Sequence, residues 1–225
     1  MAGSSAEDAL YAKGGRGAMI TGSVQLTKGT VLHLLIGQKG FKESSATGGG
    51  GGTFVVFSND TLLAAAGGGG GAGGQITSEN GMNGQIGNKG AVYGGENGLG
   101  GRVCARENNF AGGGGGFKGN GKCSYNISCT LPQPLPRECH QAGKSYLEGG
   151  LGGTGNGTGG FGGGGAPYNK FPGGGGGYSG GGVLVTSFGA KGGGGGSFFT
   201  GGLNASNQVN TGDGYVLIDF DSSLN

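Results

Sequence analysis

The sequence predicts an all-β chain in which short strands hold a bundle of extended polyglycine segments. Glycine accounts for 67 of the 225 residues, several times its usual share of about 7%. Five runs of five glycines and one run of four occur, at residues 48–52, 67–71, 112–116, 162–165, 173–177 and 192–196. No segment has the sustained 3.6-residue apolar period of a helix, and glycine costs about 1 kcal/mol per helical position relative to alanine. We therefore expect almost no helix.

Short strand-like segments alternate with the glycine runs. Four of them are expected to pair as two hairpins, 18–27 with 30–36 across Lys28-Gly29, and 53–57 with 61–66 across the turn-favouring Ser58-Asn59-Asp60. Residues 183–188 predict a further strand. A closing strand is expected at residues 215–220, where Val216, Ile218 and Phe220 fall on one face.

The similar length of the six glycine runs suggests a structural role. Polyproline II geometry rises about 3.1 Å per residue and makes no internal hydrogen bonds, so a run of five would span about 15 Å and bond to neighbouring runs. Collagen is excluded because the glycines do not recur at every third position and the chain has only five prolines. The alternative is that the runs are flexible linkers.

Several motifs follow one another in a distinctive order. They are residues 14–18, 24–40, 48–70 (GGGGGTFVVFSNDTLLAAAGGGG), 142–153 (AGKSYLEGGLGG), 159–165, 173–181 and 212–218 (GDGYVLI). Together they resemble the glycine-rich region in the extracellular part of anaplastic lymphoma kinase and leukocyte tyrosine kinase. Non-glycine anchors, such as Gly37-Gln38 and residues 54–57, make this match more specific than glycine content alone.

The resemblance implies a tumour-necrosis-factor-like antiparallel β-sandwich with a bundle of polyglycine helices inserted between its strands. We expect a single glycine-rich domain, residues 1–225, divided into a hairpin scaffold (14–66), a polyglycine bundle (67–202) with a cysteine-bearing insertion (101–145), and a closing strand (203–225). The family's strands upstream of the first glycine turn have no counterpart here, which leaves open an incomplete sandwich at the N-terminus. No kinase domain is expected in this chain.

Four cysteines, Cys104, Cys123, Cys129 and Cys139, allow three disulfide pairings. Their spacing does not match the paired C-x-x-C of a zinc ribbon. Because His140 follows Cys139, a metal site is a remote alternative to the disulfides. Disulfides need an oxidising compartment, so an extracellular or cell-surface location is expected, although no signal peptide is visible.

Four N-x-S/T sequons begin at Asn59, Asn126, Asn156 and Asn204. Asn59 lies on the predicted turn of the second hairpin, where an attached glycan would meet the least obstruction. It is therefore the best candidate for glycosylation.

No catalytic, cofactor-binding or metal site is predicted. Gly143-Lys144-Ser145 has the tail of a phosphate loop, but Glu138 stands where the upstream glycine is required. His33 and His140 have no acid, base or nucleophile partner that the sequence reveals. The 14 basic and 12 acidic residues are scattered, so no nucleic-acid surface is expected, and no stretch reaches the roughly 18 apolar residues of a membrane span.

Two functional hypotheses follow. The first is a non-catalytic extracellular module of a receptor-tyrosine-kinase-like ectodomain, which the resemblance implies would bind a cytokine-like protein and support receptor dimerisation. The alternative is a self-assembling structural or adhesive protein that joins through open sheet edges, with a phage-type adhesin tip as a more distant third. Aromatic residues near the runs would either cover the bundle or form a ligand-facing rim: Phe117, Phe161, Tyr168, Phe171, Tyr178, Phe198 and Phe199.

Overall fold

A computed structural model of the chain describes residues 1–42, 45–105, 111–123, 139–201 and 203–220. The fold is β-rich, as the sequence predicts, and the only helix among these residues is a single 3-10 turn, η1 (Tyr146–Glu148). The strands are β1 (Gly17–Gly22), β2 (Leu32–Leu35), β3 (Phe41–Lys42), β4 (Thr53–Phe57), β5 (Leu62–Ala66), β6 (Val103–Ala105), β7 (Thr154–Gly155), β8 (Gly157–Thr158), β9 (Val183–Val185), β10 (Ala190–Gly192), β11 (Phe198–Phe199) and β12 (Leu203–Asn210).

The largest sheet among these residues has the order β11-β5-β4-β2 and is antiparallel throughout. Its centre is the β4–β5 hairpin, so the second predicted hairpin is confirmed. The Asp60 N–H closes the connecting turn by donating to the Phe57 carbonyl at 3.0 Å. Asp60 has a left-handed backbone (φ 62°), a conformation that Asp and Asn adopt more readily than most residues.

The first predicted hairpin is wrong, because residues 18–27 and 30–36 do not pair with each other. The turn at Lys28-Gly29 forms, and the Thr30 N–H donates to the Thr27 carbonyl at 3.0 Å. The strands on either side pair elsewhere, β1 with β12 and β2 with β4. Residues 23–31 are exposed and contain no strand. The local sequence predicts the turn, but it carries no signal for a partner strand at the opposite end of the chain.

The closing strand also differs from the prediction. The strand in this part of the chain is β12, whereas residues 216–220 form no ladder and Tyr215 makes only an isolated bridge to Ala2. Ala2 also bridges to Met19 of β1. The N-terminal segment therefore lies between Tyr215 and β1, at the edge that a strand at residues 215–220 would need.

The strand predicted at residues 183–188 is shorter than expected. It corresponds to β9, which ends at Val185. The Thr186 N–H then donates to the Gly189 carbonyl at 2.8 Å, which turns the chain back toward β10. Phe188 on this turn is exposed.

Both faces of the β11-β5-β4-β2 sheet are covered by apolar side chains. On one face Val55 and Leu63 pack with Ile20 of β1. On the other face Phe54 and Val56 pack with Phe117, which follows a glycine run. The sheet therefore lies between the β1–β12 ribbon and the end of the glycine-rich region.

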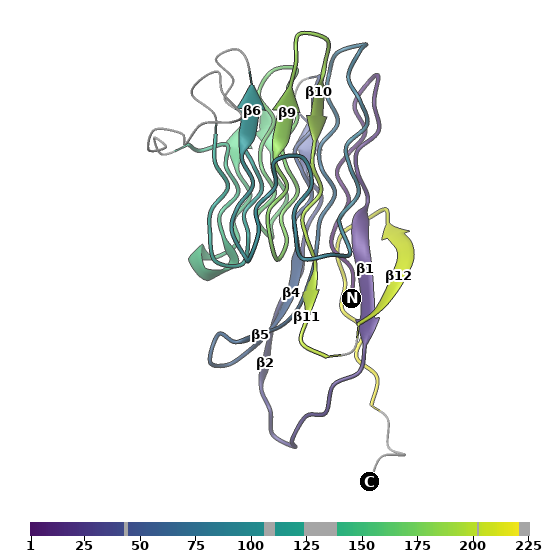
Figure 1. The fold of residues 1–225 in the computed structure, drawn as a ribbon, viewed down its shortest axis with the longest axis vertical. Helices are drawn as coiled ribbons and strands as arrows, with labels where there is room; N and C mark the ends of the chain where they lie inside the picture. The colour runs from purple at the N-terminus through teal and green to yellow at the C-terminus, as the bar shows by residue number, and fades with distance from the viewer. Residues whose placement is uncertain (43–44, 106–110, 124–138, 202, 221–225) are drawn as a thin grey trace.

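The glycine-rich segments run side by side along the long axis of the molecule, as Figure 1 shows, with β6, β9 and β10 at the far end. These three strands form a sheet of order β10-β9-β6, in which β6 and β9 are parallel. A third apolar cluster, which includes Val103, Phe171 and Val183, packs there. A further small sheet has the order β3-β8-β7. The apolar residues are thus divided among separate clusters that the glycine segments connect.

Candidate binding site

The six glycine runs are packed parts of the fold, so the flexible-linker alternative is wrong. Every glycine in them is buried. At each one, a Cβ atom would come closer than 3.0 Å to a backbone atom of another segment. Glycine is required here because its missing side chain lets the backbones approach one another.

The run at residues 173–177, called the central run below, bonds to each of the other five runs through its backbone. The N–H groups of residues 173 to 178 donate, in order, to the carbonyls of Thr47, Gly112, Gly193, Gly50, Gly115 and Gly196, at 2.8–3.2 Å. These acceptors belong to, or directly precede, runs 48–52, 112–116 and 192–196 in strict rotation. The pattern repeats every third residue, whereas a β-strand repeats every second.

The remaining two runs donate to the central run. The N–H groups of Gly71 and Gly68 bond to the carbonyls of Gly173 and Gly176, again three residues apart, and Gly165 N–H bonds to the Gly174 carbonyl. Segments with fewer glycines join the network as well. Gly181, for example, donates to Gly175 of the central run at 2.7 Å. Gly181 lies within the predicted bundle at residues 67–202 but outside the six runs, so the sequence does not single out its place in the network.

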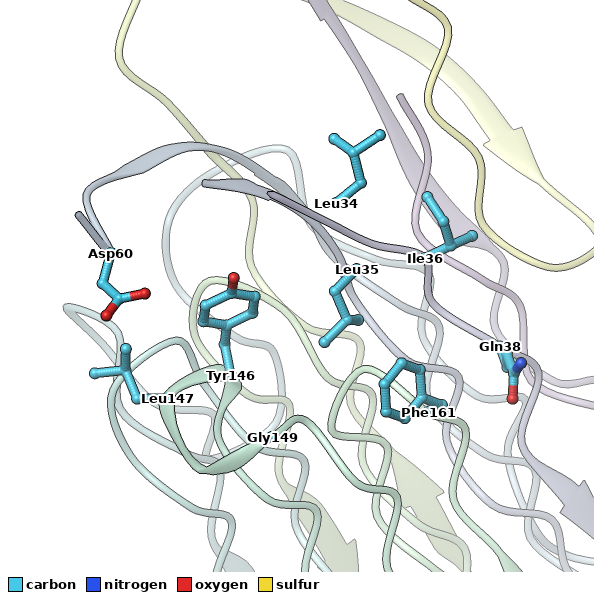
Figure 2. Close-up of a pocket in the computed structure, with 9 residues that line it drawn as sticks. All are labelled: Leu34, Leu35, Ile36, Gln38, Asp60, Tyr146, Leu147, Gly149 and Phe161. Atoms are coloured by element: carbon cyan, nitrogen blue, oxygen red, sulfur yellow. The ribbon is translucent and has the colours of Figure 1, made fainter. Parts of the chain in front are cut away.

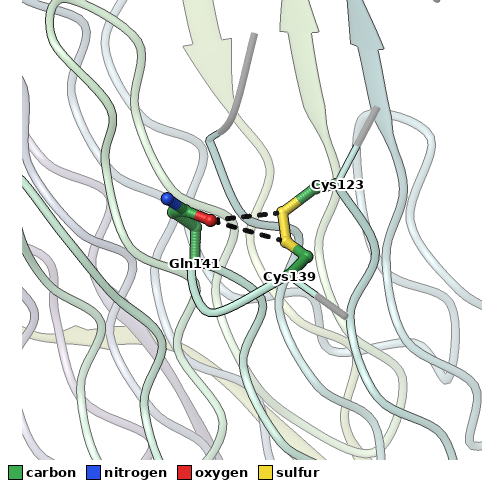
Figure 3. The surroundings of a disulfide bond; sticks show 3 residues. All are labelled: Cys123, Cys139 and Gln141. Carbon is green, nitrogen blue, oxygen red and sulfur yellow. Dashed lines mark hydrogen bonds between the residues drawn. A yellow bond between two sulfur atoms is a disulfide. The ribbon is translucent and has the colours of Figure 1, made fainter. Parts of the chain in front are cut away.

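A disulfide joins Cys123 to Cys139, whose Cα atoms are 6.0 Å apart (Figure 3). The Gln141 side-chain Oε1 lies 4.0 and 3.8 Å from the two sulfur atoms, and the Gln141 carbonyl accepts from the Ala166 N–H at 2.7 Å. The crosslink therefore lies directly beside the glycine network. Cys104 is also disulfide-bonded, while Cys129 lies outside the described residues.

Two of the four predicted glycosylation sites can be assessed in the structure. Asn59 and Asn156 are both exposed. The Asn59 Oδ1 accepts from the Thr61 N–H at 3.1 Å within the hairpin turn, and the Asn156 Oδ1 accepts from the Asn169 N–H at 3.2 Å. Asn126 and the side chain of Asn204 lie outside the part of the chain that the structure describes.

Most of the aromatic residues near the glycine runs pack against apolar clusters. Phe117 and Phe171 are buried, and Tyr178 stacks on Phe198 with ring centroids 4.7 Å apart. Tyr168 and Phe199 pack against clusters at opposite ends of the molecule. These six rings therefore cover and anchor the glycine segments. Phe161 differs from them because it lines a surface cavity.

That cavity is a groove of about 660 Å³ between the edge of β2 and the end of the glycine network (Figure 2). Its apolar lining comes from Leu34, Leu35 and Ile36 on one side and from Leu147 and Phe161 on the other. The other lining residues are Gln38, Asp60, Tyr146 and Gly149.

Hydrogen bonds to the glycine network fix the second wall of the groove. In η1, the Tyr146 N–H donates to the Gly116 carbonyl at 3.0 Å and the Leu147 N–H to the Phe117 carbonyl at 3.2 Å. The Gln38 N–H donates to the Phe161 carbonyl at 2.8 Å, which holds the two walls together at one end. The groove is therefore built where the bundle and the sheet meet.

Tyr146 and Asp60 are polar residues at one end of the groove, and Gln38 is a polar residue at the other. Burial, together with the negative charge of Asp60, holds the pKa of the Tyr146 phenol above its ordinary value of 10.0. The phenol therefore stays neutral and can donate or accept a hydrogen bond at physiological pH. No local pattern in the sequence marks this site, because its walls come from segments far apart along the chain.

The two histidines lie apart from the groove lining. His33 is exposed on β2 rather than packed in the strand interior, and His140 is exposed beside the disulfide. Among the described residues, no three His, Cys, Asp or Glu side chains are grouped so that they could hold a metal ion. In the same part of the chain, no helix is long and apolar enough to cross a membrane.

Comparison of the chain with models of known protein families and with curated proteins finds no match. The kinship that the glycine-rich motifs suggest therefore stays a prediction.

Proposed function

We propose that this chain is a non-catalytic extracellular module of the receptor-tyrosine-kinase-like kind, which binds a protein ligand. The observation that carries the proposal is the groove at the edge of β2, which is lined by both apolar and polar residues and lies on a closely packed glycine scaffold. Concave apolar sites with a few polar groups are the usual form of binding sites. The Cys123–Cys139 disulfide supports an oxidising, extracellular location.

The glycine runs are proposed to be polyproline II-type helices. Such a helix has three residues per turn and no internal hydrogen bonds. The rotation of the N–H groups of residues 173–178 among three neighbours has the same period, which supports this assignment. A strand bonds to only two neighbours in a sheet, whereas the central run bonds to five other runs. A bundle of this kind would act as a rigid spacer between its two ends.

The finer fold proposed is a tumour-necrosis-factor-like sandwich, formed by the β1–β12 ribbon and the β11-β5-β4-β2 sheet. The packing of Ile20 from β1 against Val55 and Leu63 supports this arrangement. In such a module, ligand binding would bring two copies together and so support receptor dimerisation.

Self-assembly is the second candidate, and a specific observation favours it. The segment at residues 215–220 is strand-prone but forms no ladder, and Leu217, Ile218 and Phe220 on it are exposed. Exposed apolar segments and open sheet edges are templates for pairing between copies.

Two measurements on the oxidised chain distinguish these candidates. Light scattering over a wide concentration range reports self-assembly, and a binding screen against purified secreted proteins reports ligand recognition, with reduced and alkylated chain as the control. We expect a constant monomer mass and saturable binding of a protein ligand that the reduced chain loses. A mass that grows with concentration, without any ligand, would favour the structural protein instead.

A further inference from the structure

The edge of β2 that borders the groove is open. Among the described residues, β2 is the last strand of its sheet and pairs only with β4. An open strand edge presents backbone N–H and C=O groups that an extended peptide can bond to. Leu34 and Ile36 at this edge are 48% and 37% exposed, so apolar surface lies beside the free backbone.

The groove has the length of a short peptide. Its first wall extends from Leu34 to Gln38. Four extended steps of about 3.3–3.4 Å cover about 13 Å, which suits a segment of four or five extended residues. Pairing with backbone is confined to the part of this wall before Gly37, because β2 ends at Leu35 and the Gly37 and Gln38 N–H groups already donate to Thr53 and Phe161. The volume of about 660 Å³ is enough for more than one side chain of such a segment.

Asp60 makes one end of the groove acidic. It is the only charged residue in the lining, it is exposed, and it forms no ion pair with any described residue. Figure 2 shows its carboxylate near Tyr146 and Leu147, while Phe161 and Gln38 lie at the opposite end. A bound segment would therefore meet a negatively charged end at Asp60 and an uncharged end at Phe161 and Gln38.

We propose that the groove binds an extended segment of a partner protein, which adds as a strand to the edge of β2. An apolar side chain of the segment would pack against Leu35 and Phe161, and a Lys or Arg side chain would lie at Asp60. Side chains on the same face of a strand recur at every second residue, so the two anchors are separated by an even number of positions. This inference rests on the proposed function, because it names the site and the chemistry of the partner.

The charge of the groove argues against one alternative occupant, the exposed segment at residues 215–220 of a second copy of the chain. The only charged residue within 215–220 is Asp219, an acid. An acidic segment would place like charges together at Asp60, whereas a basic segment would neutralise it.

The test uses the full chain, produced with its disulfides in a bacterial periplasm so that Asn59 carries no glycan. A library of random heptapeptides is selected against it, and the enriched peptides are measured by fluorescence polarisation. Asp60→Asn removes the charge and keeps a residue that tolerates the left-handed backbone; Asp219→Asn is its matched control. Leu147→Ala shortens an exposed groove residue, and Leu151→Ala, which changes an equally exposed leucine outside the lining, is its control.

We expect peptides with an apolar residue and a basic residue at even spacing. Asp60→Asn should weaken their binding about fivefold, the upper range for an exposed charge pair, and Leu147→Ala by at least as much. The two control variants should bind like the native chain. Enriched peptides without a basic residue, or binding that neither Asp60→Asn nor Leu147→Ala changes, would overturn the proposal. A monomer mass that doubles with concentration and is restored by Leu147→Ala would also overturn it, because the occupant would then be a second copy.

The failure of this inference is distinguishable from the failure of the proposed function. A protein ligand that binds the Asp60→Asn and Leu147→Ala variants as tightly as the native chain removes the groove as its site but leaves the module a ligand-binding protein. If selected peptides bind the groove but the chain recognises no protein ligand, the groove stands as a peptide-binding site and the proposed function fails.

Discussion

Replacing Gly175 with alanine tests the packing of the glycine network in the middle of its central run. Gly175 lies in the middle of the central run, donates to the Gly193 carbonyl and accepts from the Gly181 N–H. An added methyl group would collide with the Gly68 carbonyl oxygen and would also meet the Gly69 carbonyl oxygen at 2.8 Å. These are backbone atoms, which cannot rotate away as a flexible side chain can. The neighbouring run must therefore shift.

The size of the effect follows from three contributions. Overpacking by one methyl group costs about 1–3 kcal/mol. Weakening the two backbone hydrogen bonds of Gly175 costs about 0.5–1.5 kcal/mol each. Alanine stabilises the folded state by about 0.4–1 kcal/mol, because it lowers the conformational entropy of the unfolded chain. The net loss is about 3 kcal/mol, which lowers Tm by about 6–12 °C in a protein of this size.

Thermal unfolding followed by circular dichroism measures this change, and Gly87→Ala is the matched control. A Cβ atom at Gly87 has no atom within 4 Å, its φ is not positive, and the residue is exposed. We expect that control to leave Tm unchanged or to raise it by about 1–4 °C. If both variants have the same Tm as the native chain, the central run is not packed as described and the reasoning fails.

Three further predictions concern the crosslink, the groove and the turn. The double variant Cys123→Ser, Cys139→Ser removes a bridge between residues separated by 16 positions and should lower the free energy of unfolding by about 3 kcal/mol, measured by urea denaturation. The pKa of Tyr146 is higher in the folded chain than its ordinary value of 10.0. The stability linked to this difference is therefore fully present below about pH 10 and is lost as the pH rises through the folded-state pKa. Above about pH 10, the free energy of unfolding measured by urea denaturation should therefore fall less in Tyr146→Phe than in the native chain. An equal fall in the two proteins would contradict this. In a host that glycosylates, Asn59→Asp, which keeps an acceptor for the Thr61 N–H, should remove one glycan by mass spectrometry; an unchanged glycan mass would show that Asn59 is unmodified.

The parts of the fold that depend on local sequence could be predicted. The β4–β5 hairpin has β-branched and apolar strands joined by Ser58-Asn59-Asp60, and each of these signals lies within a few residues of the others. The pairing of β1 with β12 could not be predicted in this way, because the signals are at opposite ends of the chain. The mispredicted strand at residues 215–220 shows the same limit, since its strand propensity is real but Ala2 occupies the edge it would need.

The candidate site was less accessible to sequence reasoning than the fold. The cysteines and sequons are motifs, so they could be located before their surroundings were known. The groove has no motif, because Leu34 comes from a strand edge, Tyr146 from a short 3-10 turn and Phe161 from a glycine-rich segment. The aromatic residues illustrate the difference, since the sequence identified all seven but could not separate Phe161 from the six that pack against apolar clusters.

The threefold pattern of the glycine network gives a physical reason for the similar length of the runs. On the proposed helix, one inserted glycine would advance the chain by about 3.1 Å and rotate every later N–H group by about 120°, toward a different neighbour. Run 112–116 ends at the point where Gly116 and Phe117 accept from η1, so an insertion there would also displace Tyr146 and Leu147. The opposite wall of the groove is fixed to the sheet through β2 and β4 and would not follow. On this proposed geometry, the length of a glycine run would determine both the hydrogen bonding of the bundle and the width of the groove at its end.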